Sequence, residues 1–377
     1  TVSGIYIHIP FCKQACHYCD FHFSTSLKKK KELIEALCSE LVLRKSELKD
    51  EVQTIYFGGG TPSLLTSEEL AQIFTTIFEN YPIAEAAEIT LEANPDDLSG
   101  EVIDQFASSP INRLSIGVQS FYENDLKLMN RAHNANEALD CIKIAKDKFH
   151  NISIDLIYGI PGMDVERWKK NLDIAISLGV PHLSCYALTV EPKTALASFI
   201  KKGKVAPVDD EIAAEHYRIL QEVTYREGYE NYEFSNFGMK GYESKNNMAY
   251  WQGEHYLGIG PSAHSYDGDS RSWNVSNNSI YIKNIQSGSL PLKHETLSKE
   301  DKYNEYVMTG LRTKWGVSLD KVELSFGLKY REYLIKQAAQ YVNEEMLVWD
   351  NEVLHITKNG KFLSDGIAAN LFLVNLD

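Results

Sequence analysis

The sequence predicts an α/β fold on a parallel sheet, followed by a smaller α+β region. Six apolar, β-branched runs alternate with amphipathic helical periods between residues 4 and 188, a pattern typical of parallel strands joined by right-handed crossovers. Each run ends in a short cluster of Gly, Pro, Asn, Gln or other polar residues. A partial (β/α)6 barrel and a doubly wound open sheet both fit, because hydrophobic periodicity does not separate them.

The elements follow one another regularly. The predicted strands cover residues 4–9, 52–57, 87–91, 113–118, 152–157 and 182–188. The helices between them carry apolar residues at helical spacing and cover residues 27–48, 67–81, 99–107, 125–129, 136–148 and 164–178. One more amphipathic helix covers 209–226, and residues 228–290 form a Gly-, Asn- and Tyr-rich stretch with little periodicity. Such a stretch predicts long loops at the barrel edge.

The tail has a different character. Residues 300–314 and 330–342 have helical periods, and residues 347–356 predict a hairpin turning at 350–352. Thr357 is expected to cap a last helix. The order resembles a winged helix, but acidic residues outnumber basic ones, which favours docking or a lid over DNA binding. We therefore predict three domains, a barrel with a metal loop over 1–190, an edge extension over 191–295 and a winged-helix-like domain over 296–377.

Composition narrows the class of protein. The 377 residues are 44% hydrophobic and 24% charged, with a formal net charge of −14, which argues against nucleic acid as the main partner. No apolar run reaches the roughly 18 residues that span a membrane. Six cysteines and no expected secretory signal favour a reducing cytoplasm, where thiolates stay free for metal.

Three cysteines dominate the chemistry. Cys12, Cys16 and Cys19 have the spacing C-x3-C-x2-C directly after the first strand, at the strand end where α/β folds bind ligands. Three thiolates can hold a [4Fe–4S] cluster and leave one iron open for chemistry. Structural zinc is the alternative, with a fourth ligand available from His17, His22 or Cys38. A disulfide framework does not suit a long chain without a secretory signal.

Other candidate site residues follow the next strands. Gly58, Gly59 and Gly60 let the backbone approach a ligand without a Cβ in the way, although a lone glycine turn is weak evidence. Glu92 follows the third strand, where a surface acid is the simpler interpretation.

Asp155 lies inside the apolar fifth strand. An unpaired charge there is costly, so we expect Asp155 to pair, with Arg131 as the candidate partner. A structural salt bridge is the alternative to a binding role.

These motifs together resemble the radical S-adenosylmethionine (SAM) superfamily. The longer string from Tyr6 to Cys12, Tyr-x-His-Ile-Pro-Phe-Cys, is similar to the branch that holds the oxygen-independent coproporphyrinogen III oxidases and the HemW-type haem chaperones. The resemblance implies a partial (β/α)6 barrel, a [4Fe–4S] cluster on the three cysteines and SAM on its open iron. It also implies cleavage of SAM by one electron from a flavodoxin- or ferredoxin-type donor.

The resemblance assigns roles by position. Positions matching Tyr6, Gly59 and Glu92 contact the SAM at the cluster. Positions matching a second group contact a further SAM: Tyr18, Gly60, Thr61, Gln119, Arg131 and Asp155. No catalytic side chain is expected.

This sequence departs from the patterns of the oxidases and the chaperones at three points. Phe21 stands where the oxidases have a fourth cysteine, and only eleven residues precede Cys12; both favour the chaperones. Asn246 stands where the chaperones have a histidine in His-Asn-x-x-Tyr-Trp, and Asn is a poor iron ligand. His255 and His264 lie nearby in the sequence.

We therefore expect a haem chaperone that delivers haem to a respiratory acceptor at the membrane surface. The alternatives are a coproporphyrinogen III oxidase, which decarboxylates propionates in porphyrin synthesis, and a zinc-stabilised binding module.

Overall fold

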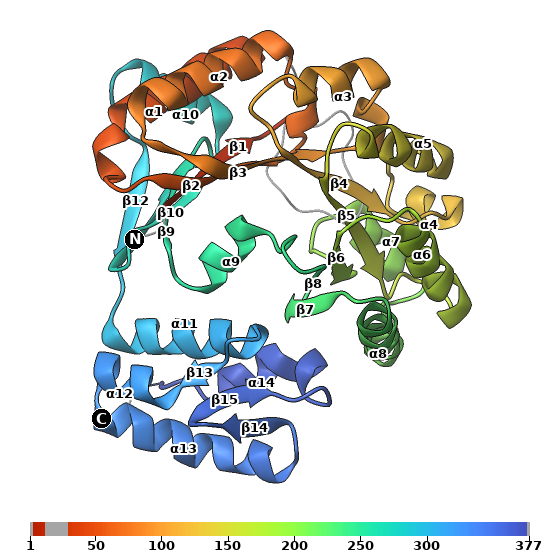
Figure 1. The fold of residues 1–377 in the computed structure, drawn as a ribbon, viewed down its shortest axis with the longest axis vertical. Coiled ribbons are helices and arrows are strands. Elements are labelled where there is room, and N and C mark those ends of the chain that lie inside the picture. The colour runs from red at the N-terminus through yellow and green to blue at the C-terminus, as the bar shows by residue number, and fades with distance from the viewer. Residues whose placement is uncertain (1–2, 12–28, 375–377) are drawn as a thin grey trace.

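A computed structural model of the chain describes residues 3–11 and 29–374. The main body is a curved sheet of twelve strands in the order β12-β11-β10-β9-β1-β2-β3-β4-β5-β6-β8-β7. Strands β1 to β6 and β9 are parallel and stand side by side in the middle of the sheet. The open, curved row of six successive strands confirms the predicted α/β fold (Figure 1).

The six predicted strands all form, and several extend into the polar residues that follow them. They are β1 Ser3–Ile9, β2 Val52–Gly59, β3 Ile83–Ala93, β4 Arg113–Gln119, β5 Asn151–Tyr158 and β6 His182–Ala187. The candidate residues Gly59, Glu92 and Gln119 thus lie on the strands themselves. A ladder fixes their spacing far better than a loop would.

The crossover helices cover the convex side of the sheet (Figure 1). They are α1 Lys30–Leu43, α2 Ser67–Asn80, α3 Gly100–Ala107, α4 Glu123–Leu128, α5 Ala135–Lys146 and α6 Val165–Ser177. Local sequence explains their starts: Thr66 and Glu69 form a capping box at α2, and Asn134 and Glu137 form one at α5. Buried apolar faces then pack the helices on the sheet.

The expectation of loops between residues 228 and 290 was wrong. This stretch forms β7 Glu230–Glu233, β8 Asn236–Gly238, α9 Lys245–Trp251, β9 His255–Ile259, β10 His264–Tyr266, β11 Ser270–Asn274 and α10 Asn278–Gln286. The strands are three to five residues long, which is too short for clear alternation. They extend both edges of the sheet, with β12 Leu292–Thr296 at one end. Two helices, α7 Ala195–Lys201 and α8 Asp210–Arg226, precede them.

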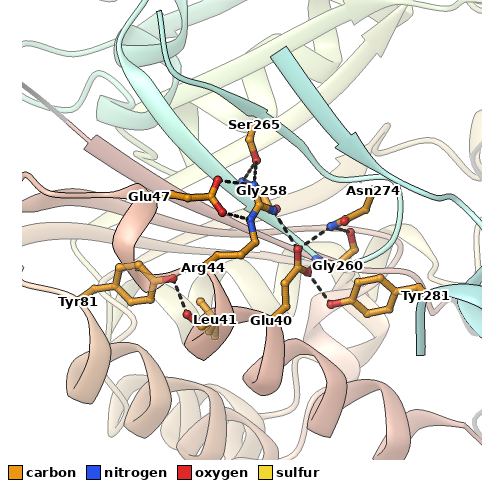
Figure 2. Close-up of polar contacts among 10 residues, drawn as sticks. All are labelled: Glu40, Leu41, Arg44, Glu47, Tyr81, Gly258, Gly260, Ser265, Asn274 and Tyr281. Atoms are coloured by element: carbon orange, nitrogen blue, oxygen red, sulfur yellow. Dashed lines mark hydrogen bonds and ion pairs between the residues drawn. The ribbon is translucent and has the colours of Figure 1, made fainter. Parts of the chain in front are cut away.

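A buried ion pair locks β9 to β11 onto the first crossover helix (Figure 2). Glu40 and Arg44 are both 0% exposed and bond each other at 2.9 Å. Arg44 also donates to the Gly258 carbonyl at 3.0 Å and to Ser265 Oγ at 3.1 Å. Arg44 Nε and Nη2 also donate to Glu47, at 2.7 and 3.0 Å. Every guanidinium nitrogen of Arg44 thus meets a partner, as burial of charge requires.

The carboxylate of Glu40 has its own donors. It accepts hydrogen bonds from the Gly260 backbone N–H at 2.8 Å, from Asn274 Nδ2 at 2.9 Å and from the Tyr281 hydroxyl at 2.6 Å. These donors come from β11, α10 and the turn after β9. One helical turn of α1 therefore fixes segments more than 200 positions later in the chain.

The C-terminal region has the predicted winged-helix-like order. It contains α11 Lys299–Arg312, β13 Val317–Ser318, α12 Leu319–Phe326, α13 Leu328–Asn343, β14 Leu347–Asp350, β15 Val353–Ile356 and α14 Ser364–Asn370. The hairpin turns at Asn351 and Glu352, both of which have positive φ. Thr357 does not cap a helix: its Oγ1 accepts from the Gly360 backbone N–H within a turn, and α14 begins at Ser364.

Arg312 of α11 joins this region to the barrel. Its guanidinium donates to Glu233 Oε1 at 2.9 Å and to Asp365 at 2.9 Å. It also lies 4.8 Å above the ring centre of Trp251, at the end of α9. Helix α9 therefore lies between the concave side of the sheet and the C-terminal helices (Figure 1).

Candidate functional site

The described candidate residues gather at the carboxyl ends of the central strands. Tyr6 lies opposite Tyr56 in the β1–β2 ladder, and Ile9 lies opposite Gly59. On β3, Glu92 pairs with Ser115 of β4, while Asp155 of β5 pairs with Ser184 of β6. Since side chains alternate along a strand, Tyr6, Tyr56, Glu92 and Asp155 project into the concave side. Cys12, Cys16, Cys19 and Tyr18 lie outside the described residues.

Tyr6, Tyr56 and Glu92 form one contact group. The two tyrosine rings stack with centroids 6.1 Å apart, and the Tyr56 hydroxyl donates to Glu92 Oε1 at 2.8 Å. The Tyr6 hydroxyl shares a 3.1 Å hydrogen bond with His8 Nδ1. Burial and the neighbouring Glu92 raise the pKa of Tyr6, so its phenol stays protonated. The group offers a fixed carboxylate beside two stacked aromatic rings.

The glycines make this arrangement possible. A Cβ on Gly58 would stand 2.9 Å from the Tyr6 ring and 3.1 Å from Glu92 Oε1. Gly59 has a φ of 109°, and a Cβ there would meet His8 and the Ile9 carbonyl. The Gly60 N–H donates to the Ile9 carbonyl at 2.7 Å, and the Thr61 N–H donates to the Phe11 carbonyl at 2.6 Å. The glycine turn is thus bonded to the backbone that leads into the cysteine loop.

A second group surrounds Asn94. Its Nδ2 donates to Thr61 Oγ1 at 3.2 Å, and its Oδ1 accepts from Arg131 Nη2 at 3.0 Å. Arg131 also donates to the Gly117 carbonyl at 3.3 Å. Gln119, buried at the end of β4, has a φ of 69°, a conformation that is costly outside glycine and is typical of functional sites. The structure therefore brings Thr61, Gln119 and Arg131 close together.

Glu92 and Asp155 are two buried carboxylates inside the barrel, and the charge of Glu92 acts on Asp155. Burial raises the pKa of Glu92 to about 7, against the lowering effects of Tyr56, the Gly59 backbone and Arg113. Burial and the charge of Glu92 raise the pKa of Asp155 to about 7. The predicted pairing of Asp155 with Arg131 was wrong: no hydrogen bond or ion pair within 4.0 Å joins them among the described residues. Arg113 and Arg131 act on Asp155 only through their fields.

Sequence reasoning missed His8, Tyr56, Asn94 and Arg113. The period-2 alternation of a strand could have found two of them, because His8 follows Tyr6, and Tyr56 precedes Gly58, by two positions. Asn94 and Arg113 carry no such signal, since their roles depend on neighbours from other strands.

The comparisons with known proteins agree with this geometry. The Radical SAM superfamily profile matches residues 6–175, and the HemN C-terminal domain matches residues 297–363. "Heme chaperone HemW" of Lactococcus lactis is 34% identical over 377 residues, covering 100% of this chain and 98% of that protein. The chain belongs to the HemW branch of the radical SAM superfamily. The Bacillus subtilis protein of the same name is also 34% identical, over 97% of this HemW-type chain and 98% of its own.

More distant likenesses extend the family. "Radical S-adenosyl methionine domain-containing protein 1, mitochondrial" of Danio rerio is 30% identical over 98% of this HemW-type chain and 87% of its own length. The solved coproporphyrinogen III oxidase (HemN) of Escherichia coli has a TM-score of 0.86 and 23% identity, covering 98% of this chain and 90% of that one. At that identity the likeness shows the shared fold.

Membership of this superfamily implies a [4Fe–4S] cluster and SAM as cofactors. The described residues fit SAM. The glycine edge leaves no room for a Cβ, so its carbonyl oxygens can meet an ammonium group. The Glu92 carboxylate stands beside it, and Asp155 lies within reach of the Glu92 charge. Both carboxyls have raised pKa values, and a bound cation would stabilise their ionised forms.

The residues matched to the haem motif lie elsewhere. Asn246 is the second residue of α9, where Lys245 N and Asn246 N both donate to the carboxylate of Glu88. His255 contacts Tyr266 edge-on, and His264 stacks on Trp273. None of the helices in the described part of the chain could cross a bilayer.

Proposed function

We propose that this chain is a haem chaperone, which binds haem and passes it to a respiratory acceptor protein. The similarity to proteins named as haem chaperones supports this proposal because it covers 100% and 97% of the chain in the two relatives from Lactococcus lactis and Bacillus subtilis. The similarity to the coproporphyrinogen oxidase supports a common fold only.

Cys12, Cys16 and Cys19 would hold the cluster, and Tyr6, Gly59 and Glu92 would hold SAM beside it. The bound pair supplies one-electron chemistry, with a flavodoxin- or ferredoxin-type protein as the donor. The chain itself orients the ligand. Tyr56 fixes the Glu92 carboxylate by a 2.8 Å hydrogen bond, and the glycine turn sets the approach distance. Residues Tyr18, Gly60, Thr61, Gln119, Arg131 and Asp155 would line a second nucleotide position.

Asn246 leaves haem without the histidine that the motif provides. Its amide is a poor ligand for iron, and its backbone N–H is already bonded to Glu88. We therefore propose that haem is held without an iron bond from this position. The acceptor is expected at the membrane surface, where respiratory haem proteins reside.

Two assays on one preparation test the proposal. Anaerobically reconstituted protein is titrated with haemin while the Soret band is followed, and a second portion receives coproporphyrinogen III, SAM and reductant. Saturable haem binding without a vinyl product is expected. A vinyl product would replace the proposal with the oxidase function, whereas elemental analysis showing zinc without iron would favour the binding module.

A further inference from the structure

A groove of about 680 Å³ separates the barrel from the C-terminal region. Its size is within the range of roughly 300–1,000 Å³ that small-molecule sites occupy. It shares no lining residue with the group of Tyr6, Glu92 and Asp155. The groove is therefore a site separate from the predicted SAM site.

Aromatic side chains form both walls of the groove. Tyr250 and Trp251 of α9, Tyr256 of β9 and Tyr266 of β10 line the barrel side. Their rings follow one another closely: Tyr250 and Tyr256 have centroids 5.9 Å apart, and Tyr256 and Tyr266 6.1 Å apart. Tyr306, Trp315 and Phe326 line the opposite side.

Most of these rings are only partly buried, and Tyr250 is 46% exposed. Half-exposed aromatic surface on two facing walls fits a flat, apolar ligand that would stack between them.

The charge on the groove suits an anion. Three basic residues, Arg271, Lys302 and Lys321, line it against two acidic ones, Glu254 and Glu305, in a chain whose formal net charge is −14. Arg271 and Lys302 are paired with Glu305 and Asp269. Lys321 forms no ion pair with any residue that the structure describes, and its ammonium lies 4.6 Å above the ring centre of Tyr306. A cation beside an aromatic wall is thus available for a carboxylate.

We propose that this groove binds a tetrapyrrole through its ring and its propionates, with Lys321 pairing a propionate and the aromatic walls covering the macrocycle. The inference rests on the proposed function and adds the location and the mode of binding. None of the described lining residues is a histidine, so ring and carboxylate contacts carry the affinity. Metal-free porphyrin therefore binds as haem does.

The test titrates the reconstituted full chain with haemin and with protoporphyrin IX, using quenching of tryptophan fluorescence. Their Kd values are expected to agree within about threefold. Tyr250→Ala and Lys321→Glu, one change on each wall, are expected to weaken both ligands about tenfold. Tyr225→Ala, at a tyrosine that is 86% exposed on α8, and Lys329→Glu on α13 serve as matched controls and should shift Kd less than twofold.

Protoporphyrin dimethyl ester isolates the charge contact. It should bind the unsubstituted chain about tenfold more weakly than the free acid does, and Lys321→Glu should cause no further loss with the ester, because the interacting partner is already absent.

Haemin binding without protoporphyrin binding would overturn the inference and leave the proposed function intact. Equal binding by Tyr250→Ala, Lys321→Glu and the unsubstituted chain would also overturn it. If neither ligand binds, the proposed function itself fails.

Discussion

Arg44→Met tests whether the buried pair in Figure 2 holds the edge strands in place. The substitution keeps an unbranched stem of similar helix propensity but removes the charge opposite Glu40. Breaking a buried pair by removing one partner costs about 3–5 kcal/mol, because the remaining charge is uncompensated. Glu40 retains three donors, from Gly260, Asn274 and Tyr281, so we expect the lower end, about 3 kcal/mol.

The assay is urea unfolding followed by far-UV circular dichroism, supported by thermal melting. For a chain of 377 residues, with an unfolding entropy of roughly 2.1 cal/mol/K per residue, about 3 kcal/mol corresponds to a Tm lowered by roughly 4 °C. Because the edge strands depend most on the pair, limited proteolysis should cleave first between residues 255 and 275. If the first cleavage falls outside residues 255–275, the pair does not secure this edge.

Arg218→Met is the matched control. Arg218 bonds two glutamates on α8, Glu215 and Glu222, but its side chain is 51% exposed. Exposed pairs contribute about 0–1 kcal/mol, so this variant should unfold almost as the parent chain does. If Arg44→Met and Arg218→Met lose the same stability, burial of the pair has no special effect and the reasoning is refuted.

Four further predictions concern Glu92, Gly58 and Asn246. SAM affinity, measured by calorimetry, should rise as the pH increases through about 7, because a cation favours ionised Glu92; Glu92→Gln should flatten that profile, and an unchanged profile would contradict the assignment. By the same linkage, the pKa of Glu92, raised from 4.5 to about 7, stabilises the ligand-free fold most below pH 4.5. About 3 kcal/mol of this folding stability is lost at pH 7 and above. Gly58→Ala should weaken SAM at least tenfold, since its Cβ meets Tyr6 and Glu92, whereas Gly100→Ala, with open space around it, should not. Positions 246 and 250 are four residues apart on α9 and share a helix face. Asn246→His should therefore tighten haemin binding about tenfold and leave protoporphyrin IX binding unchanged. Equal tightening of both ligands would show that iron is not the cause.

The parallel strands could be predicted because each carries a mostly buried, mainly apolar run that ends at polar residues. Residues 152–157 show this clearly, with Asp155 as the one charge in an otherwise apolar or small-polar strand. Whether Arg131 bonds Asp155 could not be predicted, because it depends on how β4, β5 and the loop after α4 meet in space. Sequence spacing alone favoured Arg131, whereas the structure bonds Arg131 to Asn94 and Gly117.

The edge strands could not be predicted from the sequence, for a different reason. β10 has only three residues and β11 has five, and their partners lie on neighbouring short strands. Tertiary pairing, rather than a local pattern, makes them strands. Thr357 shows the same limit at a helix start: its residue type suits an N-cap, but the chain turns at Gly360 first. The groove also depends on two distant segments, and no local motif marks it.

The position of β1 has a consequence for how the protein is made. The strand lies between β2 and β9, and β9 is residues His255–Ile259. During synthesis on the ribosome, β1 emerges well before β9, because the 245 residues 10–254 separate the two strands. Such long-range pairing slows folding and leaves an edge open to wrong association. We therefore expect iron–sulfur assembly next to β1 to follow translation rather than accompany it, and nascent chains halted before residue 255 to depend on molecular chaperones.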